Sequence, residues 1–371
     1  MSLISRLKTY AAAIGLDALA VTSAAPFAAE AAILRERSAA DLYPAFITRN
    51  LAQRCDPTVV LPGCRSVIVA ALSYHSREEP SEPSRRSGYV ARYAQCDDYH
   101  QVLYAKLQLL AEFLTPHAPD SHRYKIQVDN GPCLERAAAL RAGLGWQGKN
   151  NLLYVPGLGS WVVLGILLTN ITLPHQVLSP QSRCGSCERC LKSCPTDALV
   201  GPYTIDPQRC LAYITQMPGL IPHTYRKLMG ARLWGCDTCQ LVCPHNAKLP
   251  VRRHAEWGEP LKTPDLIALL QMSPAEFTAQ FGRTALHWRG VKTLRRNAAI
   301  VLGNLGDREA VGALAAQVRH HPSPIQRAVC AWALGEIGGE SARSSLSQAL
   351  QHEREPQVRA EIQTALAAIG G

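Results

Sequence analysis

Eight of the thirteen cysteines are spaced along the chain like the ligands of two iron–sulfur clusters. One group reads Cys184-x2-Cys187-x2-Cys190-x3-Cys194-Pro195, the other reads Cys236-x2-Cys239-x3-Cys243-Pro244, and Cys210 lies between them. Thiolates at successive x2 intervals can bind three corners of one 4Fe-4S cluster, whereas the cysteine before proline is turned away and reaches the other cluster. We therefore assign cluster one to Cys184, Cys187, Cys190 and Cys243, and cluster two to Cys194, Cys210, Cys236 and Cys239.

Structural zinc and disulfides are the alternatives for these cysteines. Zinc sites favour two pairs of ligands separated by a spacer, and neither the compact run nor the Cys-Pro endings are needed for a tetrahedral ion. Disulfides require an oxidising compartment. The other thiols, Cys55, Cys64, Cys133 and Cys330, have no metal-ligand spacing, and we interpret them as ordinary buried cysteines.

The N-terminus predicts a helix rather than an export signal. Arg6 and Lys8 precede an alanine-rich stretch, but Asp17 interrupts the apolar run and charged residues follow soon after. The longest apolar run, 161–168, is far too short to cross a bilayer. We therefore expect a cytoplasmic protein with no membrane partner.

Length and charge limit the class of protein. The 371 residues are 47% hydrophobic, which is enough for two or three domains with a sizeable core. Lys and Arg exceed Asp and Glu by 39 to 29, a formal net charge of +10. This surplus is typical of proteins with a polyanionic partner, usually a nucleic acid, but a basic enzyme without such a partner fits it equally well.

The chain divides into three predicted parts. Residues 1–177 combine buried-strand patterns at 67–72, 124–128 and 161–168 with helical patterns at 99–114 and 133–143, which predicts a layered α/β (α+β) domain. Residues 178–250 form a ferredoxin-like domain around the two clusters. Residues 251–371 are predicted to be a linker and an α-helical solenoid of HEAT-like repeats.

A period of 32 residues supports the solenoid. Arg295, Arg327 and Arg359 follow this spacing, as do leucines and the glycine-ended helix termini. The repeated arginines either contact phosphates along one surface or are the solvated ends of stacked helices. We predict contacts with the phosphates of a nucleic acid for Lys292, Arg295, Arg296 and Arg327.

Two clusters ligated only by thiolates transfer electrons one at a time and break no bonds. The N-terminal domain must therefore bind a second cofactor or a redox substrate. Its sequence has neither a GxGxxG turn after a strand nor a P-loop, and no CxxxCxxC triad is present. A flavin, a nicotinamide cofactor and radical adenosyl chemistry are therefore less favoured as the second redox partner of the clusters.

Several motifs resemble those of epoxyqueuosine reductases over essentially the whole chain. They are Arg92-Tyr93-Ala94, Asp98-Tyr99-His100, Val128-Asp129-Asn130-Gly131-Pro132, Leu134-Glu135-Arg136, 142–150 (AGLGWQGKN) and 235–240 (GCDTCQ). The resemblance implies a cobalamin-dependent enzyme that converts epoxyqueuosine to queuosine at the wobble position of tRNA anticodons. It also implies a base-off cobalamin between the N-terminal domain and the clusters, and a cobalamin-binding domain related to reductive dehalogenases.

The resemblance also assigns residue roles. Asp129 follows a predicted strand and precedes a turn that would place it in a cleft at the carboxyl edge of a sheet, and the family's aspartate is a general acid. From the residues alone, a turn-forming role next to Gly131-Pro132 is favoured for Asp129, and only the resemblance reverses this preference. Cobalamin or substrate contacts are expected from Cys96, Tyr99, His100, Lys149 and Asp237 in addition to Asp129.

Three other functions remain open at this stage: a reductive dehalogenase, a non-enzymatic electron carrier, and an RNA-binding module with structural clusters. The absence of a twin-arginine signal and the presence of the repeats disfavour the first. The partners expected of the reductase are tRNA carrying epoxyqueuosine and an external electron donor such as a flavodoxin or ferredoxin system. We expect the reductase to be a monomer.

Overall fold

The structure, a computed structural model, describes residues 1–75, 86–118, 120–175, 177–178, 180–252, 254–262 and 264–370. The chain folds into two compact units, each assembled from separate segments. The first unit contains Met1–Glu78, Cys96–Gln208 and Thr238–Pro260, and the second contains Glu79–Gln95, Arg209–Asp237 and Leu261–Gly371. The segment 178–250, predicted as one cluster domain, therefore contributes to both units, and the three predicted domain limits stay a prediction.

A four-stranded antiparallel sheet forms the centre of the first unit, in the order β1-β2-β7-β4. Every residue of β2 is buried, as expected for an apolar run in a central strand. Ser66, the first residue of β2, lies opposite Thr169 of β7 on one side and opposite Ser23 of β1 on the other side. The strands are β1 (Ala18–Ser23), β2 (Ser66–Ser73), β7 (Val162–Thr169) and the edge strand β4 (Tyr124–Gln127).

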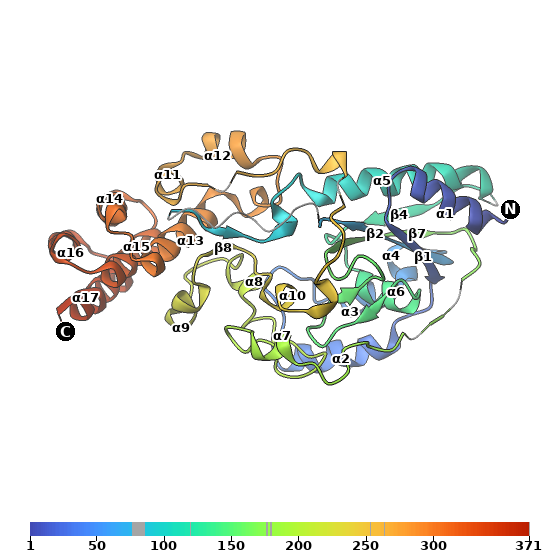
Figure 1. Ribbon diagram of the computed structural model, residues 1–371, viewed down its shortest axis with the longest axis horizontal. Helices are drawn as coiled ribbons and strands as arrows, with labels where there is room; N and C mark the ends of the chain where they lie inside the picture. Colours follow the sequence, from blue (N-terminus) through green and yellow to red (C-terminus); the bar gives the residue numbers. More distant parts are fainter. Residues whose placement is uncertain are drawn as a thin grey trace. The chain divides into compact units, whose positions relative to one another are not determined.

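Helices cover both faces of this sheet (Figure 1). On one face α5 packs against β7, and α1 packs against α5. A Cβ atom at Gly165 of β7 would lie 2.7 Å from the Leu107 side chain, so glycine at this position permits α5 to approach the strand closely. On the other face α2, α3 and α6 close an apolar core with Val67, Val69 and Leu168. These helices are α1 (Leu3–Ala13), α5 (Tyr99–Leu114), α2 (Ala28–Ala39), α3 (Leu51–Cys55), α4 (Pro57–Val60) and α6 (Glu135–Arg141).

The predicted strands and helices of the N-terminal part are confirmed, with β1 as an addition that the sequence analysis missed. The antiparallel sheet corrects one argument, because no row of parallel strands shares a carboxyl edge there. The first unit also contains the short pair β5 (Trp146–Gln147) and β6 (Leu153–Tyr154), and the one-turn helices α7 (Arg189–Lys192) and α10 (Thr238–Leu241).

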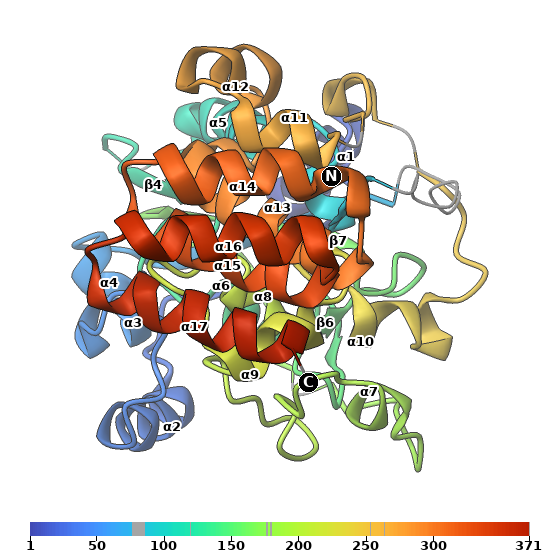
Figure 2. The same cartoon turned by 90° about the vertical axis from the view of Figure 1, so that its left-hand side faces the viewer.

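Stacked helix pairs dominate the second unit and confirm the predicted repeats. Helices α13, α15 and α17 pack side by side in one layer, and α14 packs beside α16 in another (Figure 2). Gly306 ends α13 in the left-handed conformation and Gly338 ends α15 at positive φ. The solenoid helices are α13 (Gly290–Leu305), α14 (Val311–His320), α15 (Pro324–Ile337), α16 (Glu340–His352) and α17 (Pro356–Gly370).

Before the solenoid, the second unit has shorter elements. Strands β3 (Tyr89–Val90) and β8 (Arg232–Trp234) pair in parallel. A capping box at Ser273 begins α12. The helices are α8 (Leu211–Ile214), α9 (His223–Arg226), α11 (Leu266–Gln271) and α12 (Pro274–Phe281). In the described part of the chain, none of the helices has the length and apolar character needed to cross a membrane.

The arginines of the 32-residue repeat have one common structural role. Each lies in the first two turns of a solenoid helix. Its guanidinium group donates to the backbone carbonyl of the residue that caps the end of an earlier helix. A cation at a helix C-terminus satisfies an orphan carbonyl and interacts favourably with the helix dipole. The three bonds run from Arg295 to Met272 at 2.6 Å, from Arg327 to His321 at 2.9 Å, and from Arg359 to Glu353 at 2.7 Å.

Candidate functional site

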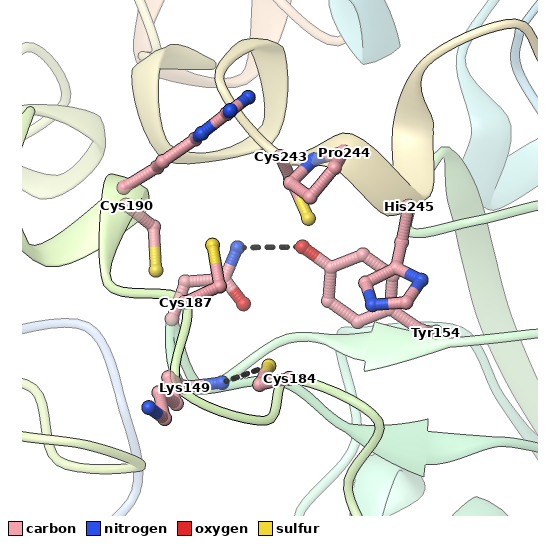
Figure 3. A pocket seen from close by; sticks show the side chains of 10 residues that line it. Lys149, Tyr154, Cys184, Cys187, Cys190, Cys243, Pro244 and His245 are labelled. Atoms are coloured by element: carbon pink, nitrogen blue, oxygen red, sulfur yellow. Dashed lines mark hydrogen bonds between the residues drawn. The ribbon is translucent and has the colours of Figure 1, made fainter.

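Four cysteines meet in one pocket of the first unit. Cys184, Cys187 and Cys190 come from the loop before α7 and from α7 itself, and Cys243 follows α10. Their side chains face a common space of about 290 Å³, part of it open to solvent (Figure 3). The structure therefore brings together the four residues assigned to cluster one, although 53 residues separate Cys190 from Cys243.

Hydrogen-bond donors surround these sulfurs. The Lys149 backbone N–H donates to Cys184 Sγ at 3.4 Å. Tyr154 hydrogen-bonds Cys243, and Asn150 Nδ2 donates to the Tyr154 hydroxyl at 2.9 Å. Four thiolates with N–H and O–H donors on their sulfurs are the donor set that a 4Fe-4S cluster requires. The residues present thus fit a cluster at this position.

Tyr154 and His245 line the cluster-one pocket, and Trp146 packs against both rings. The Trp146 and Tyr154 rings stack 4.6 Å apart, and the His245 ring meets the edge of Trp146 at 4.8 Å. Burial raises the pKa of the Tyr154 hydroxyl far above its ordinary value, and the bond to Cys243 raises it further. Tyr154 therefore remains a protonated donor to the sulfur.

The four residues assigned to cluster two are divided between the units. Cys194 and Cys239 belong to the first unit, and Cys210 and Cys236 belong to the second. Within the first unit, Cys194 Sγ accepts the Ala198 backbone N–H at 3.3 Å. The assignment of this cluster stays a prediction.

A second polar site lies at the end of β4. Asp129 is exposed, has a positive φ of 58°, and accepts a 2.6 Å hydrogen bond from the Tyr99 hydroxyl on its Oδ2. Tyr99 is buried at the start of α5, where Asp98 caps the helix by accepting the His100 N–H. The His100 ring stacks on Tyr99 with centroids 4.1 Å apart. The structure thus brings Tyr99, His100 and Asp129 together.

Glu135 supports this site, and the sequence analysis gave it no role. Its Oε1 accepts the Asp129 backbone N–H at 2.7 Å from the first turn of α6. Burial raises the pKa of Glu135 to about 8, and the Asp129 charge adds to the shift. At neutral pH a largely neutral Glu135 can therefore hold the Asp129 loop without placing a second negative charge beside it. The available signal was the acidic residue six positions after Asp129.

The remaining predicted contacts lie elsewhere. Lys149 lines the cluster-one pocket. Cys96 is buried in the first unit. Asp237, in the second unit, is 2% exposed and accepts bonds from the Tyr89 hydroxyl and the Arg92 backbone N–H, each at 2.8 Å.

Three of the four residues named as phosphate contacts bind groups within the protein, and the assignment of all four to phosphate stays a prediction. Arg296 is 3% exposed and donates to the carbonyls of Met217 and Gly219 at 2.7 and 2.6 Å. Arg327 forms a two-pronged ion pair with Glu353, and Arg295 caps α11. Lys292 is the one exposed residue of the four.

Comparison with known proteins identifies the family. An epoxyqueuosine reductase of Listeria monocytogenes serovar 1/2a is 41% identical over 339 residues, covering 90% of this chain and 88% of the relative. The chain belongs to the epoxyqueuosine reductase family. The family's sequence model, described as epoxyqueuosine reductase QueG, matches residues 54–130. A 4Fe-4S double cluster binding domain matches 183–246 and HEAT repeats match 290–367, which confirms both predictions.

Other members of the epoxyqueuosine reductase family agree over the same length. The Bacillus subtilis reductase is 37% identical and covers 87% of this chain and 85% of its own. A solved epoxyqueuosine reductase with an epoxyqueuosine-modified tRNA-Tyr stem loop superimposes with a TM-score of 0.95, 35% identity, and coverage of 100% and 99% of the two chains. A Bacillus subtilis structure, described with an aspartate catalytic loop swung out of its active site, gives a TM-score of 0.93 at 35% identity, with 99% of each chain covered.

Proposed function

We propose that this protein is an oxidoreductase that reduces epoxyqueuosine to queuosine at the wobble position of tRNA anticodons. The observation that carries the proposal is the agreement with a solved family member in complex with an epoxyqueuosine-modified stem loop, which extends over the whole chain. A wobble base lies in a single-stranded loop, so it can enter a pocket at modest unstacking cost. The positive net charge of +10 suits an RNA substrate.

The reaction removes one oxygen and restores a double bond. The epoxide takes up two electrons and two protons, both carbon–oxygen bonds break, and the oxygen leaves as water. Two one-electron clusters can deliver the electrons in sequence. Cobalamin, when bound, supplies the low-valent metal that the family resemblance implies for the chemical step. The chain's own residues must then provide substrate binding and at least one proton.

Asp129 is our proposed proton donor. Its carboxyl is exposed at the end of β4, and the Tyr99 hydroxyl fixes Oδ2 at 2.6 Å. The Glu135 bond fixes the backbone of the same residue. A carboxyl held at both its backbone and its side chain is positioned to give a proton to a departing oxygen. Cobalamin or substrate contacts stay proposals for Cys96, Tyr99, His100, Lys149 and Asp237.

Substitution of the acid tests this role. Asp129→Asn should retain cluster content, cobalamin binding and stem-loop affinity, while the single-turnover rate falls roughly 100-fold or more, the usual contribution of a general acid. Asp120→Asn, at another exposed aspartate of the same unit, is the matched control. The assay is anaerobic turnover of an epoxyqueuosine stem loop, read by mass spectrometry of the nucleoside. Undiminished turnover in Asp129→Asn would reject the acid assignment.

Metal analysis tests the cofactors independently. Reconstituted protein should contain about eight irons and one cobalt per chain if both clusters and cobalamin bind. Iron without cobalt, together with no turnover, would instead favour an electron carrier. The flavodoxin or ferredoxin donor, the monomeric state and the cytoplasmic location stay predictions.

A further inference from the structure

An open hollow lies next to the cluster-one pocket, and Cys243 lines both. Arg189 also borders the two spaces. A molecule seated in the open hollow would therefore be separated from cluster one by a single thiolate ligand. We call this hollow the donor surface; it consists of Arg189, Lys192, Ser193, Leu241, Val242, Cys243, Pro244 and Ala247.

The donor surface has an apolar part and a basic part. Leu241 is 46% exposed, and Val242, Pro244 and Ala247 continue the apolar part. Arg189 and Lys192 are both exposed on α7. Glu188 offsets part of this charge, but its carboxylate lies 3.8 Å from the Lys192 ammonium in a pair with both side chains largely in solvent.

We propose that the donor surface docks an acidic one-electron carrier protein of the flavodoxin or ferredoxin kind, and that the electron enters cluster one through Cys243. The reduced carrier loses one electron, the cluster core gains it, and no bond or proton is transferred. Apolar contacts with charged residues beside them are typical of small transient interfaces. The proposal rests on the proposed function, since that function requires filled clusters and an external reductant.

Charge selects the partner class. Arg189 and Lys192 attract a negatively charged surface and accelerate encounter, an effect that salt weakens. RNA would also be attracted to these cations, but it cannot supply an electron. The exposed Leu241 and the adjacent Pro244 suit a protein face better than a phosphate backbone.

The test measures how fast the clusters are reduced, not turnover. Arg189→Glu/Lys192→Glu and the charge-neutralising Arg189→Gln/Lys192→Gln are compared with wild type after matching iron content. The control, Arg6→Glu/Lys8→Glu, makes the same charge change on α1, which packs against α5 at the sheet. Reduced acidic flavodoxin and dithionite are each mixed anaerobically with the reconstituted protein in a stopped-flow spectrophotometer, at low and high ionic strength.

We expect charge reversal at the donor surface to lower the second-order rate with flavodoxin roughly tenfold or more at low salt. The neutralising pair should show a smaller loss, the difference from wild type should shrink at high salt, and the α1 control should match wild type. Dithionite is a small anion that needs no docking surface, so its rate should fall much less than the flavodoxin rate. No epoxyqueuosine is present, so a failure of the proposed function would leave this result interpretable.

Three results would overturn the proposal. Equal flavodoxin rates in all variants would show that the carrier docks elsewhere. An equal slowing with dithionite would show that the two cations act on the potential of the cluster rather than on docking. Loss of stem-loop binding with an unchanged flavodoxin rate would assign the surface to RNA.

Discussion

Replacing Glu135 with alanine removes the hydrogen bond that holds the Asp129 backbone. Asp129 adopts a left-handed conformation, which costs a residue other than glycine roughly 1–2 kcal/mol. The bond from its N–H to Glu135 Oε1, at 2.7 Å, offsets this cost by roughly 0.5–1.5 kcal/mol. Because about 1.4 kcal/mol corresponds to a factor of ten, Glu135→Ala should lower the equilibrium constant for this loop conformation roughly two- to tenfold.

Hydrogen exchange and single-turnover kinetics measure this effect. The peptide that covers residues 128–134 should lose protection at the Asp129 amide in Glu135→Ala, and the single-turnover rate should fall by the same factor. Glu135→Gln keeps an acceptor oxygen and should restore both. Glu112→Ala, at an exposed glutamate of α5, is the control. An Asp129 amide that is equally protected in Glu135→Ala and wild type would refute the positioning role.

The raised pKa of Glu135 adds a dependence on pH. A carboxyl whose folded-state pKa lies above its ordinary value of 4.5 destabilises the fold once it ionises, so the loop should loosen as pH rises through about 8. Glu135→Gln cannot ionise and should not show this change. If both proteins lose protection in parallel between pH 7 and 9, ionisation of Glu135 is not the cause.

The remaining predictions concern the solenoid and cluster one. Glu361→Ala should destabilise the second unit by roughly 3–5 kcal/mol, since it leaves Arg226, which is fully buried, without its carboxylate partner; an unchanged thermal transition would contradict this. The bond from Arg327 lowers the pKa of Glu353, so this pair stabilises the fold above pH 4.5. Its contribution should disappear on acidification below that value. The measurement is the difference in melting temperature between wild type and an Arg327→Ala/Glu353→Ala protein as a function of pH. Cys187→Ser should remove about half of the iron, with the loss confined to cluster one; full iron content would reject its role as a ligand.

The sequence predicted those features that depend on local pattern. The apolar run at 67–72 became the buried strand β2, and the 32-residue period became stacked helix pairs, because each is determined by periodicity along the chain. Strand β1 was missed because Ala18–Ser23 shows no clear alternation of apolar and polar residues; its place in the sheet comes from pairing with β2.

The parts that could not be predicted depend on contacts between distant segments. The period showed that Arg295 and Arg327 occupy equivalent positions, but not that their guanidinium groups turn inward to helix ends. The role of Arg296 depends on carbonyls about eighty residues earlier. The same holds for Cys243, whose spacing assigned it to cluster one but gave no indication that it also borders an open surface.

The repeats are part of the structure that positions two of the cysteines. Helix α13 donates side-chain hydrogen bonds to the backbone of the segment between Cys210 and Cys236. Asn297 donates to the carbonyls of Thr215 and Leu233 at 2.7 and 2.8 Å, and Asn304 donates to those of Arg226 and Gly230 at 2.8 and 2.9 Å. Shortening the protein ahead of α13 would leave these buried carbonyls without donors. During biosynthesis the segment between Cys210 and Cys236 therefore reaches its final shape only after the ribosome has made α13, so a cluster that uses these two cysteines should be inserted after that point.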